Sequence, residues 1–230
     1  MFKKELKQSD YILIAANLLP VIGVLFLDWS PAEVFMVYAL ETVIIGFFTL
    51  LKMGIVTLFR KTDMWYNQGS SQRVSGLFFM LFFLVHYGMF VAIQTGLFIE
   101  VSGIGKDYHL GFFDFFLHWP KYFTLGNLQY MLLGFFISYG FNMIWNFIRP
   151  GLYRTAPMML LMFQPYGRIF IQQVTVILGS MFLSFGAGKI FILIFAAVKI
   201  FFEAFVNYDG ILNKTMQDMK KESGDNLPLS

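Results

Sequence analysis

The stretch YALETVIIGFFTLLKM, Tyr38 to Met53, decides the fold class. It lies within an apolar run over residues 33–59. A helix rises about 1.5 Å per residue, so roughly 20 apolar residues cross the hydrocarbon core of a bilayer. The charged side chains of the quoted stretch are Glu41 and Lys52. The stretch therefore predicts a membrane-spanning helix that carries ionisable groups at depth, where they are expensive and often functional.

The whole chain shares this apolar character. Of its 230 residues, 57% are hydrophobic, 20% aromatic and only 13% charged, with a mean hydropathy of +0.64. Soluble domains carry about 25% charged residues, and one water-soluble core could not hide so much apolar surface. The chain has no cysteine, which excludes disulfides, thiolate metal ligands and cysteine nucleophiles. We expect an all-α membrane protein.

Apolar windows along the chain predict a bundle of six transmembrane helices. This bundle forms a single domain over residues 1–206, and residues 207–230 form a cytoplasmic polar tail. The predicted spans cover residues 11–27, 33–59, 75–99, 128–148, 169–185 and 189–206.

The distribution of basic residues predicts the orientation. Residues 1–10, 60–73, 149–168 and the tail each contain three Lys or Arg, whereas the segments on the other side contain Lys106, Lys121 and Lys189. Cytoplasmic loops carry an excess of Lys and Arg. Both termini are therefore expected in the cytoplasm, and the basic balance needs no nucleic acid as a partner.

Aromatic residues dominate the segment between the third and fourth spans, YHLGFFDFFLHWPKYF. We expect an amphipathic helix over residues 107–119 that lies in the membrane interface or re-enters the membrane. Asp114 and His118 are one helical turn apart and could share a proton or a metal ion. A simpler interpretation is that they form the polar stripe of an interfacial helix.

Four polar residues in the outer half of the spans form the first candidate site: Tyr38, Glu41, His86 and Gln94. If the second and third spans pack antiparallel, Glu41 and His86 could meet directly or through water. Such a pair can hold a proton or supply two metal ligands. Asp114, His118 and His109 would add ligands if the interfacial helix folds inward. Alternatively, His86 forms an interhelical hydrogen bond that locks the bundle.

A second group of polar residues is predicted in the cytoplasmic half of the spans. These side chains could line a vestibule that binds an anion or a lipid phosphate. Alternatively, the long cationic side chains simply extend to the lipid headgroups. The group comprises Asn142, Asn146, Arg149, Arg168, Gln172, Lys199 and Glu203.

The second and third spans also carry a family resemblance. The matching positions are Glu41, Gly46, Lys52 and Met53 in the second span, and His86, Tyr87, Gly88 and Phe90 in the third. They resemble a family of uncharacterised bacterial and archaeal integral membrane proteins. Relatives often carry a second histidine where Gln94 stands, so this chain departs from that pattern. The resemblance implies the cytoplasmic membrane of a prokaryote and no established activity.

The leading functional hypothesis is a small proton-coupled or metal-ion transporter or channel that uses Glu41 and His86. One alternative is a membrane-embedded enzyme or redox protein that binds a metal or haem. The other alternative is a structural or assembly subunit of a membrane complex. A divalent metal ion fits these residues better than haem, and whether the chain is an enzyme is left open. Membrane lipids, and either a second copy of the chain or another membrane protein, are the expected partners.

Overall fold

The computed structural model describes residues 8–67, 70–102, 128–206 and 208–223, most of which are helical. The helices are α1 (Gln8–Phe26), α2 (Pro31–Phe59), α3 (Gly76–Ser102), α6 (Leu128–Met143), α7 (Met158–Phe163), α8 (Tyr166–Ser184), α9 (Gly188–Phe205) and α10 (Tyr208–Glu222). A π-helix, Ile144–Ile148, extends α6, and a 3₁₀ turn covers Leu152–Arg154. Two strands, β1 (Thr62–Asn67) and β2 (Ser70–Ser75), complete the described structure.

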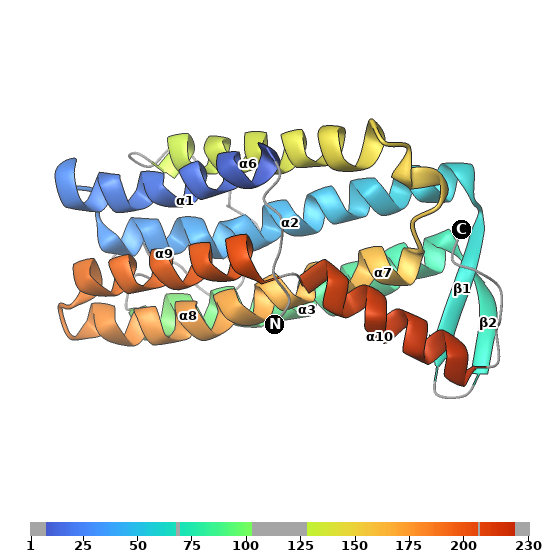
Figure 1. Ribbon diagram of the computed structural model, residues 1–230. Coiled ribbons are helices and arrows are strands. Elements are labelled where there is room, and N and C mark those ends of the chain that lie inside the picture. The colour runs from blue at the N-terminus through green and yellow to red at the C-terminus, as the bar shows by residue number, and fades with distance from the viewer. Residues whose placement is uncertain (1–7, 68–69, 103–127, 207, 224–230) are drawn as a thin grey trace.

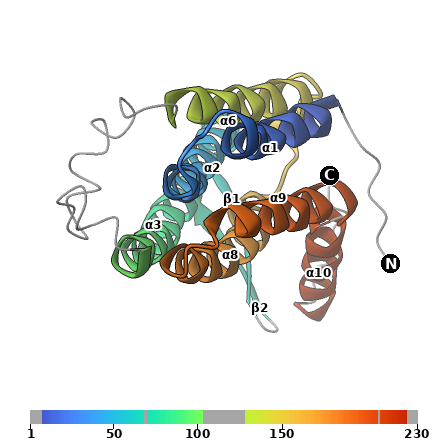
Figure 2. The same cartoon turned by 90° about the vertical axis from the view of Figure 1, so that its left-hand side faces the viewer.

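The long helices lie side by side in a bundle, with the strands, α7 and α10 gathered at one end (Figure 1). The view along the bundle places α2 between α1 and α6 on one side and α3 and α8 on the other (Figure 2). Helix α2 also contacts α7 and α9. It is therefore the helix through which most of the bundle is connected.

Helices occupy all six predicted ranges to within a few residues at each end. Among the described residues, three helices are long and apolar enough to cross a membrane: Met36–Phe59, Gly76–Leu97 and Gln129–Ile148. Residues Asn17–Phe26 form a shorter apolar helix. The arrangement of six membrane spans therefore stays a prediction. The predicted interfacial helix over 107–119 lies outside the described residues.

A β-hairpin joins α2 to α3, so the prediction of an all-α fold is wrong in this segment. The two strands pair antiparallel, from Thr62 opposite Ser75 to Asn67 opposite Ser70. The hairpin folds back on the helices, because the Trp65 ring packs against the rings of Phe78, Phe79 and Phe82 on α3. The segment is short and lies between two long apolar helices, which is why hydropathy alone does not reveal its strands.

The segment predicted as a polar tail contains α10. This helix packs against α7 and β1, and the Met216 side chain is buried. The last described residues therefore add a layer to the end of the bundle that also carries the hairpin (Figure 1).

Two glycines allow α2 and α3 to approach closely. A Cβ at Gly46 would lie 2.6 Å from the Tyr87 ring, and a Cβ at Gly76 would lie 2.3 Å from the Thr57 hydroxyl. Tyr87 also donates a hydrogen bond of 2.8 Å to the backbone carbonyl of Thr42. These contacts fix the antiparallel register of the two helices. They also determine which faces of α2 are available to pack against α6 and α9.

Candidate functional site

The most deeply buried charges of the described structure meet at the centre of the bundle. Glu41 on α2 is 0% exposed and Lys199 on α9 is 5% exposed. The Lys199 ammonium forms an ion pair with Oε2 of Glu41. The other carboxylate oxygen, Oε1, accepts a hydrogen bond of 2.8 Å from the hydroxyl of Tyr139 on α6. Three helices therefore converge on one carboxylate.

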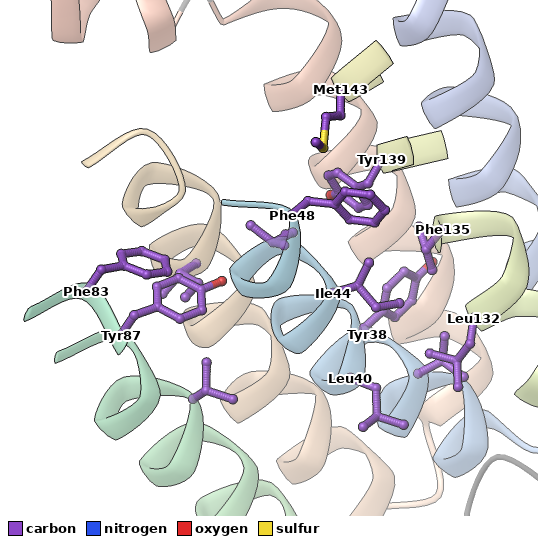
Figure 3. Close-up of a cluster of buried hydrophobic side chains, with 14 of the residues drawn as sticks. Tyr38, Leu40, Ile44, Phe48, Phe83, Tyr87, Leu132, Phe135, Tyr139 and Met143 are labelled. Carbon is purple, nitrogen blue, oxygen red and sulfur yellow. The ribbon is translucent and has the colours of Figure 1, made fainter. Parts of the chain in front are cut away.

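Aromatic rings surround the ammonium. Lys199 Nζ lies 4.7 Å from the centre of the Tyr38 ring and 4.8 Å from that of Phe135, which are distances of a cation–π interaction. The Tyr38 hydroxyl donates a 3.4 Å hydrogen bond to the backbone carbonyl of Asn17 on α1. Tyr38, Phe135 and Tyr139 occupy the side of α2 away from Phe83 and Tyr87 (Figure 3). These three aromatic rings thus line one side of the ion pair.

The electrostatics of this site are those of a buried ion pair. A single charge without a partner costs several kcal/mol or more in a protein interior. Here the carboxylate has two polar partners, and the ammonium has the carboxylate and two ring faces. Both charges are buried, so the arrival of a proton at Glu41 would remove its ion pair with Lys199.

The structure does not bring His86 to Glu41. His86 Nδ1 instead forms a 2.7 Å hydrogen bond with the Tyr166 hydroxyl at the start of α8. The imidazole lies between the rings of Phe82 and Phe90 on its own helix. The physical reason is helix rotation: Tyr87, not His86, faces α2, and Glu41 faces α6 and α9. The predicted Glu41–His86 pair is therefore replaced by Glu41–Lys199.

Residues 2–223 match the family described as a family of unknown function, DUF6498. The chain belongs to this family. The expectation of an uncharacterised family is thus confirmed, while bacterial and archaeal membership stays a prediction. No curated protein matches the chain, and no solved structure does.

Gln94, another predicted site residue of this DUF6498 chain, does not join the ion pair. Gln94 is buried on α3, and its amide makes no hydrogen bond to any part of the chain that the structure describes. His109, Asp114 and His118 lie outside the described residues. Across the four described ranges, no group of three His, Asp or Glu side chains comes together to hold a metal ion.

The predicted cytoplasmic group is divided. Lys199 belongs to the Glu41 site rather than to that group. Arg149 is exposed and lies 5.1 Å from the Trp145 ring, which fits a cation that extends toward the headgroups. Asn142 and Asn146 are half-buried, and Asn146 lies in the π-helix. The side chains of Arg168, Gln172 and Glu203 are not described.

Sequence reasoning missed three members of the site around Glu41. Lys199 is assigned by depth to the cytoplasmic half, and Tyr139 and Phe135 are not singled out. The available signal was charge: Glu41 and Lys199 are oppositely charged residues near the middle of apolar helices, and burial of one requires the other. Tyr139 offered a weaker signal, since a buried hydroxyl needs a partner.

Proposed function

We propose that this DUF6498 member is a multi-pass membrane protein that moves protons, alone or coupled to a solute, through the Glu41–Lys199 pair. The observation that carries the proposal is a buried carboxylate–ammonium pair contributed by two helices, to which a tyrosine hydroxyl on a third helix donates a hydrogen bond. Ionisable residues inside membrane helices mark ion and substrate paths by default.

The surface of the bundle supports a membrane location. Leu77, Leu81 and Val85 form an exposed apolar face of α3, and they are 62%, 63% and 71% exposed. Water-soluble proteins rarely expose large contiguous apolar surfaces. In a bilayer this face contacts acyl chains. Following the family resemblance, we place the protein in a prokaryotic cytoplasmic membrane. The distribution of Lys and Arg favours both termini in the cytoplasm.

The proposed chemistry is a reversible change of charge at Glu41. A proton binds to carboxylate Oε2, the carboxyl group becomes neutral, and the ion pair with Lys199 Nζ is lost. The Tyr38 and Phe135 rings then hold the ammonium, and Tyr139 continues to donate its hydrogen bond to Oε1. Release of the proton restores the ion pair. Because the partners lie on α2 and α9, each change alters the attraction between these helices, which is a physical basis for coupling.

Proton flux into proteoliposomes tests the proposal. An imposed membrane potential should drive acidification, reported by a trapped pH-sensitive dye, in vesicles that contain the wild-type protein. Glu41→Gln and Lys199→Met should each reduce the flux to the level of protein-free vesicles. Glu100→Gln and Lys189→Met are the matched controls, because both side chains are exposed. Lys189 lies on α9, as Lys199 does, and Glu100 lies on α3, which packs against α2. Both controls should retain wild-type flux.

A pair that only fastens helices predicts a different pattern. In that case the double variant Glu41→Gln/Lys199→Met, which removes both charges together, should fold and behave like the wild type. The proposal requires this double variant to be folded and inactive. Wild-type flux no greater than that of empty vesicles, or full flux in the folded double variant, would exclude the proposed role.

A further inference from the structure

A second buried polar group lies on α3, away from the ion pair. Gln94 and its neighbour Thr95 are both 0% exposed. Among the described residues, neither polar atom of the Gln94 amide has a hydrogen-bond partner, and the Thr95 hydroxyl oxygen has none. The mechanism proposed above uses neither residue. Three buried polar atoms on consecutive residues therefore need an explanation.

The cost of leaving such atoms unsatisfied argues for a bound species. An unpaired buried donor or acceptor costs about 1–3 kcal/mol, and buried polar groups are normally bonded to protein or to ordered water. A threonine on a helix can bond to the carbonyl one turn earlier, but Thr95 does not. The amide supplies a donor and an acceptor, and the hydroxyl supplies both. This set matches a small neutral molecule that donates and accepts at once.

The antiparallel register of α2 and α3 shows where Gln94 and Thr95 lie along the bundle. Gly46 lies against Tyr87 and Thr57 lies against Gly76, so continuing the antiparallel register puts Gln94 level with Ala39. Ala39 is fully buried and has one of the smallest side chains, so it leaves room beside a long amide side chain. Ala39 lies two residues before Glu41, toward the end of the bundle where α2 begins. The group is therefore at nearly the same depth as the ion pair.

We propose that Gln94 and Thr95 bind ordered water inside the helix bundle. The two residues form a hydration site in a helix interface that is otherwise apolar at Phe83 and Val91. The water site stands by itself, and its link to proton movement rests on the proposed function. If Glu41 exchanges protons, water at this depth is a carrier that an apolar interface would lack.

Radiolytic hydroxyl-radical labelling of the full chain, reconstituted in lipid, tests the water site directly. Radicals formed from bound water label the side chains beside it. Val91 is 4% exposed and lies one turn before both residues, whereas Phe83 is 1% exposed and lies two turns further away. After correction for intrinsic reactivity, Val91 should be labelled several-fold faster than Phe83. In Gln94→Leu/Thr95→Val, the labelling of Val91 should fall to the Phe83 level.

Two results would overturn the inference. Equal protection of Val91 and Phe83 in the wild type would mean that no water is bound there, and unchanged Val91 labelling in the variant would mean that other groups bind it.

Thermal unfolding of Gln94→Leu is an independent test of whether the amide is hydrated. A hydrated amide predicts a lower or unchanged Tm, and an orphaned amide predicts a higher one. The exposed Gln129→Leu is the matched control. Labelling does not depend on flux, so failure of the water site and failure of the proposed function are distinguishable.

Discussion

At the scale of single residues, Glu41 and Lys199 are interdependent, and removing one should cost more than removing both. We predict that Glu41→Gln lowers the free energy of unfolding by about 3–5 kcal/mol, because it removes the carboxylate from a buried ion pair with Lys199. Glu41→Gln/Lys199→Met should recover most of that loss. Denaturant or thermal unfolding in detergent measures the difference. A double variant less stable than Glu41→Gln would contradict the assigned ion pair.

Tyr139 tests the hydroxyl that is bound to the carboxylate. Tyr139→Phe removes a 2.8 Å hydrogen bond to a charged group, and such bonds contribute about 1.5–3 kcal/mol. The variant should lose that amount of stability. Tyr130→Phe, which alters an exposed tyrosine on the same helix, is the control and should change little. Equal effects of the two substitutions would show that the Tyr139 hydroxyl does not stabilise the site.

At the scale of elements, the contact between α2 and α3 decides which residues meet. Gly46→Ala should destabilise the protein by about 1–3 kcal/mol, because its Cβ would overlap the Tyr87 ring. That ring cannot simply move away, since its hydroxyl is bonded to the carbonyl of Thr42.

Gly134→Ala is the control for this prediction. It lies within α6, and a Cβ there meets nothing within 4 Å, so the substitution should be neutral or stabilising by up to about 1 kcal/mol through helix propensity. Unfolding measurements on both variants decide the matter. A stable Gly46→Ala protein would show that α2 and α3 do not pack as closely as described.

The helices were predictable from sequence, whereas the hairpin and α10 were not. Long apolar runs specify helices because every backbone group must be bonded within an apolar environment. The hairpin depends instead on the packing of Trp65 against α3, and α10 depends on burial of Met216 against the end of the bundle. Both are tertiary effects that override the local polar composition.

The candidate site was predictable in part. Glu41 and Tyr38 stand out as polar residues in an apolar helix, and the structure places both at the ion pair. Hydropathy gives the depth of His86 but not its direction. The direction depends on Tyr87 packing against Gly46, which turns His86 toward Tyr166. Partner choice is thus set by helix rotation, which sequence patterns alone do not specify.

At the scale of the whole molecule, we propose that a buried carboxylate in a membrane helix bundle takes up and releases a proton. The most direct measurement is infrared difference spectroscopy of the reconstituted protein between neutral and acidic pH. We predict a C=O stretching band of a protonated carboxylic acid that is absent in Glu41→Gln and retained in Glu100→Gln. Identical difference spectra for the wild type and Glu41→Gln would contradict the account.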